Sequence, residues 1–171
     1  CSLRVVRSDE VTVGAIDWEA VPPRRSFAFD GICHETALLA SYQPENAAVA
    51  LGVCAALRRA GWPVDRRSEQ EGIASARWPA RFEVLGVSPL LIVDGAHNLD
   101  GARALVASLA EVQAGRAQSG GGVIMVMSVL ADKDYEAMVA TLAARAQAFF
   151  TFTAPSPRAL SAEELAVCAR T

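Results

Sequence analysis

PLLIVDGAHNLDGARAL, residues 89–105, is the stretch that decides the fold of this chain. Its four apolar residues at 90–93 are typical of a strand that is buried on both faces, as in a parallel sheet. The polar turn DGAHN then lies at the carboxyl end of that strand, where open α/β sheets bind their ligands. An amphipathic helix is predicted to follow over residues 99–113. Asp94 and His97 carry the most reactive side chains of the turn.

Composition and charge argue against several classes of protein. Of the 171 residues, 52% are hydrophobic and 20% are charged, which fits one large globular domain, or one domain with part of another. The net charge of −3 and the lack of an apolar run near the roughly 20 residues of a membrane span give no reason to expect nucleic acid or membrane as partners. The four cysteines are scattered without a C-x-x-C pair, which argues against a zinc site or a disulfide scaffold and predicts a cytoplasmic location. Because the chain begins with Cys rather than Met, we expect it to be a fragment of a longer protein.

The first 75 residues are predicted to form a β-rich piece and one helix. Alternating or apolar runs bounded by Gly, Pro and Asp predict short strands at residues 3–7, 11–13, 26–30 and 35–42. Pro44 suits the first position of a helix, and the apolar residues that continue to Leu57 predict a helix buried almost all round. The polar segment after it, with two Trp-Pro pairs, predicts a domain boundary that divides the chain into residues 1–75 and 76–171.

Strands and helices alternate in the second part of the chain. Strands are predicted at residues 82–87, 90–94, 123–127 and 148–153. Beside the helix over residues 99–113, two more are predicted, one with Asp132 as its N-cap and one after a capping box made by Ser161 and Glu164. The order β-β-α-β-α-β-α predicts the α/β class, with a Rossmann-like, mostly parallel sheet and flanking helices.

The turn from Asp94 to Asn98 offers several groups to a ligand. The Asp94 carboxylate can accept hydrogen bonds from ribose hydroxyls or hold a cation, and Gly95 lets the backbone approach a ligand closely. Asn98 is a natural N-cap, and the helix after it presents free N–H groups to an anion. The same Asp and Asn could instead only shape a turn and cap a helix. The turn is not a dinucleotide fingerprint, because the chain has no G-x-G-x-x-G.

Asn46 and Arg81 are candidates outside this turn. Asn46 lies in the first turn of the helix that starts near Pro44, where its amide could read the edge of a base, although a polar first turn is also ordinary. Arg81 begins a predicted strand just after the domain boundary. Its guanidinium could clamp a phosphate there, or it could be a surface arginine without a ligand.

Asp132, Lys133 and Arg158 follow the ends of two other predicted strands. Each could be a solvated surface charge, and Asp132 could be an N-cap. Because the carboxyl ends of parallel strands meet at one edge of a sheet, these residues and Asn98 predict a polar rim around the turn at Asp94.

The motifs, taken in order, resemble those of one family. The set is Y-Q-x-x-N-A from Tyr42, W-P-x-R-F-E from Trp78, D-G-A-H-N from Asp94, L-A-D-K-D from Leu130 and S-P-R-A-L from Ser156. From about residue 35 to the end, this set resembles the C-terminal half of folylpolyglutamate synthase/dihydrofolate synthase, a member of the ATP-dependent Mur ligase superfamily. The resemblance implies that residues 76–171 form a Mur ligase C-terminal domain, which we expect to be truncated. Residues 1–75 would then be the end of a central ATPase domain.

The resemblance also implies a reaction and a role for four residues. In this family ATP phosphorylates a folate carboxylate to an acyl phosphate, which the amine of L-glutamate attacks to form an amide, with ADP and phosphate released. By motif position, Asn46 would face the adenine, Arg81 the terminal phosphates and Asp94 the ribose hydroxyls. His97 would lie near the incoming glutamate.

The family's P-loop, magnesium ligands and carbamylated lysine belong to its central domain, and this chain has no G-x-x-x-x-G-K-[ST]. We therefore expect ATP and magnesium as cofactors, folate or dihydropteroate as substrate, and the catalytic residues and metal ligands in a missing N-terminal part of the same chain. The fragment alone is expected to be inactive. Three positions depart from the family pattern: Gly is usual where Ala80 and Ser41 stand, and Pro is common at Leu99.

Two other functions stay open at this point. Another Mur-type ligase that acts on a cell-wall precursor would share the nucleotide motifs. A non-catalytic α/β binding module would share the fold without the chemistry. A P-loop upstream of Cys1 would separate both ligases from the module.

Overall fold

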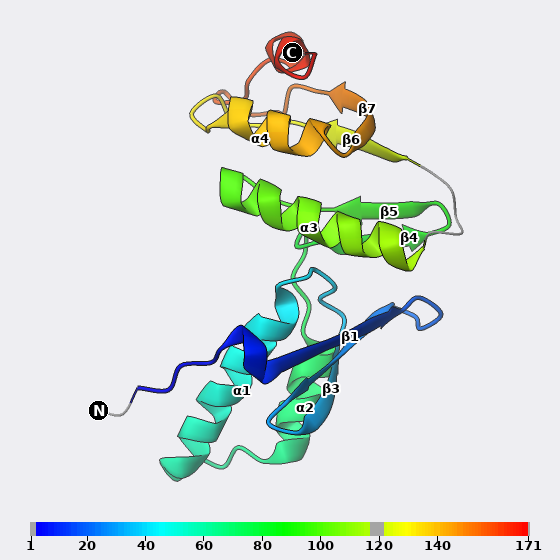
Figure 1. The fold of residues 1–171 in the computed structure, drawn as a ribbon. Coiled ribbons are helices and arrows are strands. Elements are labelled where there is room, and N and C mark those ends of the chain that lie inside the picture. Colours follow the sequence, from blue (N-terminus) through cyan, green and yellow to red (C-terminus); the bar gives the residue numbers. More distant parts are fainter. Residues whose placement is uncertain (1–2, 117–121, 171) are drawn as a thin grey trace. The chain divides into compact units, whose positions relative to one another are not determined.

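A computed structural model describes residues 3–116 and 122–170 of the chain (Figure 1). The chain gathers into two compact units, Cys1–Asp94 and Gly95–Thr171, and each unit has its own apolar core. Helices and strands occur in both units, so the predicted α/β class is confirmed. The domain boundary expected between residues 75 and 76 stays a prediction.

An antiparallel meander opens the first unit. The short 3-10 helix η1 (Ser8–Glu10) precedes strands β1 (Val11–Asp17), β2 (Arg24–Phe29) and β3 (Ile32–Thr36), which lie in that order. Between β2 and β3, Asp30 and Gly31 have φ angles of 49° and 72°, and two successive positive φ angles are what a tight hairpin turn needs. This Asp-Gly turn sets the register that pairs Phe29 with Ile32.

Two of the predictions for this region are wrong. Residues 3–7 form no strand, because an ion pair between Arg4 and Glu10 ties this segment to η1. The strand that was expected to run on toward the helix ends at Thr36. The Thr36 hydroxyl accepts a hydrogen bond from the Leu38 N–H (3.1 Å), and this local turn competes with further strand pairing.

Helix α1 (Gln43–Arg59) has Pro44 in its first turn, as predicted, and helix α2 (Arg66–Ser75) follows it. Ala48 and Leu51 of α1 are buried in one cluster with apolar residues of β1 and β2. The expectation that α1 is buried almost all round is wrong, because Val49 and Val53 are exposed. A helix that packs on one sheet buries one face, and these two valines lie on the other.

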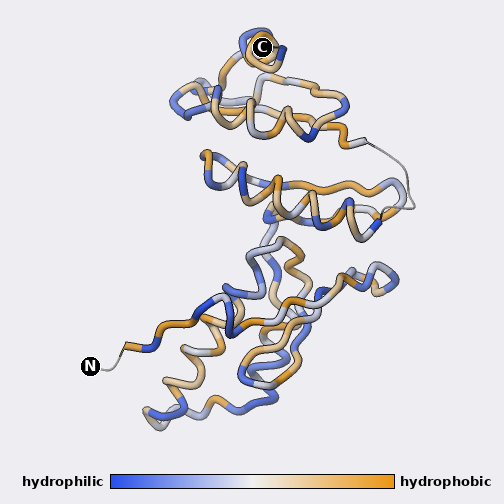
Figure 2. Tube along the Cα trace, in the orientation of Figure 1, coloured by the Kyte–Doolittle hydropathy of each residue, from blue (hydrophilic) through white to orange (hydrophobic). Residues whose placement is uncertain are grey.

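Strands β4 (Glu83–Val87) and β5 (Leu90–Val93) form an antiparallel hairpin in the first unit. β5 is one of the hydrophobic segments of the chain (Figure 2), yet Leu91 and Val93 are exposed on one of its faces. The prediction of a parallel strand buried on both faces is therefore wrong. Two residues, Ser88 and Pro89, connect the strands, and so short a connection allows only antiparallel pairing.

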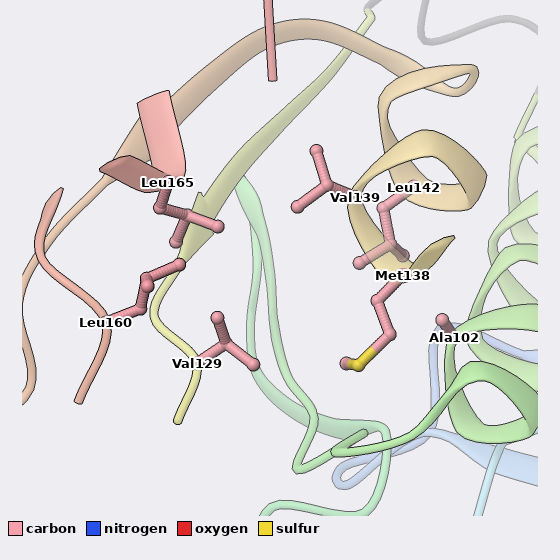
Figure 3. Packing of buried hydrophobic residues seen from close by; sticks show 7 residues of the cluster. All are labelled: Ala102, Val129, Met138, Val139, Leu142, Leu160 and Leu165. Carbon is pink, nitrogen blue, oxygen red and sulfur yellow. The ribbon is translucent and has the colours of Figure 1, made fainter. Parts of the chain in front are cut away.

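The second unit alternates helices and strands in the predicted order. Its elements are α3 (Leu99–Gly115), β6 (Val123–Met127), α4 (Tyr135–Ala143), β7 (Ala146–Thr151) and α5 (Ala162–Cys168). β6 and β7 pair in parallel, as predicted, and the capping box of Ser161 and Glu164 starts α5. Ala102, Met138 and Leu165 come from three different helices and are fully buried in one core cluster (Figure 3). No helix within the two described ranges is long and apolar enough to cross a membrane.

His34 is a buried titratable group in the first unit. Its ring stacks on Phe27, with 5.2 Å between the ring centroids, and its Nδ1 has no hydrogen-bond partner among the described residues. Burial lowers the pKa of His34 below its usual 6.5; the charge of Glu69 on α2 opposes this effect and that of Arg66 adds to it. The fold therefore favours the neutral imidazole.

We predict that the free energy of unfolding falls as the pH drops below about 6.5, the ordinary pKa of histidine. As the pH falls, the unfolded chain binds a proton at His34 before the folded chain does. The stability that comes from the neutral imidazole is therefore present above that pH and is lost below it, by at most about 1.4 kcal/mol per pH unit. Urea unfolding at several pH values measures the slope. His34→Phe keeps a ring against Phe27 and should flatten the slope. Equal slopes for wild type and His34→Phe would contradict the prediction.

Candidate functional site

The segment between α2 and β4 is a turn with unusual backbone geometry. Ala80 has a φ of 54° and Phe82 a φ of 49°, so both adopt the left-handed conformation that is uncommon for residues other than Gly, Asn and Asp. The Arg81 N–H donates to the Trp78 carbonyl (3.3 Å) and closes the turn. Strained backbone of this kind gathers at active sites and ligand clamps, and it persists only where the surrounding structure holds it.

Two carboxylates hold the turn at the two strained residues. The Ala80 N–H donates to Oε2 of Glu83, and the Phe82 N–H donates to Oδ2 of Asp94. The distance between nitrogen and oxygen is 2.8 Å in both bonds. Glu83 is the first residue of β4 and pairs with Val93, the last residue of β5, so the hairpin itself brings both acidic residues to the turn. Phe82 is 1% exposed, and an amide at that depth needs a hydrogen-bond partner.

A cavity of about 160 Å³ lies beside the turn, within the first unit. Trp78 and Arg81 line it, and the guanidinium carbon of Arg81 lies 5.8 Å from the centroid of the Trp78 ring. Pro22, Leu39 and Glu83 contribute to the rest of its wall. Trp78 is 63% exposed and so accessible to a ligand. An apolar hollow with an aromatic face and a cation at its edge suits a flat ligand that carries negative charge.

Asn46 lies in the first turn of α1 and is exposed. Its Nδ2 donates to Oε1 of the buried Gln43 over 3.3 Å, which orients the amide. Asn46 is not among the residues that line the cavity. Of the three residues expected at the nucleotide, the structure therefore brings Arg81 and Asp94 to one turn and leaves Asn46 on a different element of the same unit.

His97 and Asn98 begin the second unit, and both are exposed. Asn98 is the N-cap of α3, as one of the two interpretations of this turn expected, and its Oδ1 accepts a hydrogen bond from the Gly101 N–H (2.8 Å). A Cβ on Gly101 would lie 3.1 Å from that oxygen and 3.3 Å from Ala96, so a side chain there would crowd the cap. Nδ1 of His97 lies 3.2 Å from the carbonyl oxygen of Gly95, which orients the imidazole beside the helix start.

Asp132 and Arg158 form an ion pair between the loops that follow β6 and β7, with Nη2 and Oδ2 2.5 Å apart. The prediction that Asp132 is an N-cap is wrong, because α4 begins later, with Asp134 at that position. The hydrogen bond from Arg158 holds the pKa of Asp132 below its usual range. Lys133 lies in the same loop, and its N–H donates to the Leu130 carbonyl (3.1 Å). Three of the predicted rim residues thus belong to two loops that meet in the second unit.

Residues 80–170 match the family model described as Mur ligase, glutamate ligase domain. The chain belongs to the Mur ligase family. The matched region starts at the strained turn, at Ala80, and contains Asp94, His97 and the ion pair of Asp132 with Arg158.

The relatives to which this chain is similar include folylpolyglutamate synthases, the group that its motifs resemble. The folylpolyglutamate synthase of Lacticaseibacillus casei is 33% identical over 128 residues, which are 74% of this chain and 28% of that protein. The structure of Mycobacterium tuberculosis folylpolyglutamate synthase complexed with ADP is 28% identical, with a TM-score of 0.70 over 95% of this chain and 35% of that one. E. coli FolC in complex with DHPP and ADP is 29% identical, with a TM-score of 0.65 over 96% of this chain and 36% of that one. The chain therefore spans about a third of the length of these Mur ligases.

Phe82 and Glu83 take part in this site although sequence reasoning did not single them out. The signal that could have found them is their place in the W-P-x-R-F-E motif, directly after Arg81. The left-handed backbone at Ala80 also gives a physical reason why the resemblance led us to expect Gly at this position, since glycine adopts positive φ without strain.

We predict that Ala80→Gly raises the free energy of unfolding by about 0.5–1 kcal/mol. Relief of the left-handed strain, roughly 1–2 kcal/mol, outweighs the roughly 0.5–1 kcal/mol by which the freer glycine favours the unfolded chain. Urea unfolding of both proteins measures the difference. Ala76→Gly is the matched control, because Ala76 has a φ of −55° and the same change there should only destabilise. A loss of stability in Ala80→Gly equal to that in the control would contradict the prediction.

Proposed function

We propose that this chain is part of an ATP-dependent ligase that adds L-glutamate to folate or dihydropteroate through an acyl phosphate. Membership of the Mur ligase family and similarity to folylpolyglutamate synthases, two of them solved with ADP, support the proposal. The observation that carries it is the turn at Arg81, a strained segment held by two carboxylates beside an aromatic-lined cavity. The guanidinium at this turn fits the anionic phosphate tail of a nucleotide.

In this proposal Arg81 contacts the terminal phosphates of ATP. Its guanidinium is exposed, and a planar fork of N–H donors matches the oxygen atoms of a phosphate. Within the described residues it forms no salt bridge, so ligand binding there would not first have to break one. Asn46, oriented by Gln43, would contact the adenine from the start of α1.

Asp94 would have two roles. One oxygen of its carboxylate accepts the Phe82 N–H, and an ionised carboxylate has about four lone-pair sites in all. It can therefore also accept hydrogen bonds from ribose hydroxyls without releasing the turn. This double use makes ribose binding depend on the same residue that supports Arg81.

The reaction would proceed in two displacements. The substrate carboxylate attacks the γ-phosphorus of ATP, an acyl phosphate forms and ADP leaves. The amine of glutamate then attacks the acyl carbon, the amide bond forms, and phosphate leaves with the electron pair of the broken C–O bond. His97 would lie on the glutamate side, with Asn98, Lys133 and the pair of Asp132 with Arg158 as a polar rim.

The remaining machinery would lie outside this chain. Because the chain spans about a third of the length of its relatives, we place the ligands of a magnesium ion in a part of the protein that this chain does not include. When bound there, magnesium would neutralise phosphate charge during the transfer. We therefore propose that the isolated chain is inactive. From the scattered cysteines we also propose that the whole enzyme is cytoplasmic.

Two alternatives stay distinguishable by experiment. A Mur-type ligase for a cell-wall precursor would use ATP in the same way but would not respond to folate. A non-catalytic module would not release phosphate at all. Purified full-length protein with ATP, L-glutamate and a reduced folate or dihydropteroate therefore tests the proposal. Phosphate release should require both glutamate and the folate-type substrate, and release that is independent of folate would overturn it.

We predict that Arg81→Ala raises the KM for ATP of the full-length enzyme about 10-fold or more, because a charge-assisted contact to phosphate is worth about 1.5–3 kcal/mol. The KM for the folate-type substrate should change far less. Arg67→Ala is the control, because Arg67 is an exposed arginine on α2 that is paired with Glu71. Steady-state kinetics at saturating glutamate measures both constants. Equal values of the ATP KM in wild type and Arg81→Ala would remove Arg81 from the site.

A further inference from the structure

The turn at Arg81 contains one strained residue on each side of the arginine. Ala80 and Phe82 are left-handed, with φ angles of 54° and 49°, and neither is a glycine. The left-handed conformation is strained for an L-residue, so the turn would relax unless something held it. Because Arg81 lies between them, relaxation at either position would redirect its side chain.

The two hydrogen bonds that hold the turn differ in their surroundings. Asp94 binds the amide of Phe82, which is buried, so that bond belongs to the interior of the first unit. Glu83 binds the amide of Ala80 over 2.8 Å, is only partly buried, and lines the same cavity as Arg81 and Trp78. The Glu83 bond is therefore the one that holds the turn on its ligand-facing side.

Glu83 is also two residues from Arg81, close enough in sequence for the two side chains to form an ion pair. Its carboxylate instead accepts a backbone N–H, and no salt bridge between the two is found among the described residues. Bound in this way, the carboxylate fixes the turn and leaves the guanidinium over the Trp78 ring. A side chain that is held before the ligand arrives loses less conformational freedom on binding.

We propose that Glu83 is a positioning residue, which clamps the Ala80 amide so that Arg81 is pre-organised for the phosphates of ATP. This inference rests on the proposed function of Arg81. To that function it adds a second residue, which does not touch the nucleotide. A clamp of this kind needs an acceptor oxygen at the right reach. It does not need the negative charge itself, which distinguishes it from an electrostatic role.

Steady-state kinetics of the full-length enzyme test the proposal with four single variants. Glu83→Ala should raise the KM for ATP about tenfold and change the KM for the folate-type substrate less than twofold. Glu83→Gln keeps an acceptor oxygen and should stay within about threefold of wild type, whereas Glu83→Asp keeps the charge but is too short and should resemble Glu83→Ala. Glu71→Ala removes an exposed, ion-paired glutamate of α2 and is the matched control, with no change expected.

A double variant separates this inference from the proposed function. In an Arg81→Ala background, Glu83→Ala should raise the KM for ATP no further, because the arginine that it positions is gone. An undiminished tenfold effect in that background, or a Glu83→Asp enzyme closer to wild type than Glu83→Gln, would overturn the clamp. An Arg81→Ala enzyme with an unchanged KM for ATP would instead overturn the proposed function of Arg81 itself. If Glu83→Ala does not fold, the comparison of Glu83→Gln with Glu83→Asp still decides whether Glu83 acts as a clamp.

Discussion

The hydrogen bond from the Phe82 N–H to Oδ2 of Asp94 is the contact on which the candidate site depends. It joins the residue that precedes β4 to the residue that follows β5, at the open end of the hairpin. It also gives a partner to an amide whose residue is 1% exposed and left-handed. Without it, a buried amide would be unsatisfied, at a cost of about 1–3 kcal/mol, and the turn that carries Arg81 would lose its inner support.

The same bond explains how one short segment can serve both folding and binding. Strain at Ala80 and Phe82 is tolerable because each strained amide donates to a carboxylate. One carboxylate belongs to the first residue of β4 and the other to the residue directly after β5. Arg81 lies between these fixed points, with its guanidinium over an exposed indole. The Mur ligase match begins at this turn, so the strained backbone belongs to the region that the family shares.

Sequence reasoning predicted most elements of the fold, and it failed both at local turns and where distant partners decide. Helical periodicity and capping chemistry are local, and they correctly placed α3 and the capping box at Ser161. The direction of β5 was missed because its apolar run was interpreted alone, although the two residues between the predicted strands allow only a hairpin. Asp132 was assigned to a helix cap because its partner, Arg158, is far along the chain. The left-handed backbone at Phe82 could not be foreseen, since phenylalanine rarely adopts it and only the carboxylate of Asp94 and the buried ring make it stable.

Amide hydrogen exchange at Phe82 tests this account most directly, because it measures the bond on which the turn depends. The account predicts that this amide is protected in the wild-type chain and that Asp94→Ala speeds its exchange by about tenfold or more, the equivalent of roughly 1.4 kcal/mol. Asp94→Asn keeps an acceptor oxygen and should retain much of the protection. An exchange rate at Phe82 that is the same in wild type and Asp94→Ala would contradict the account.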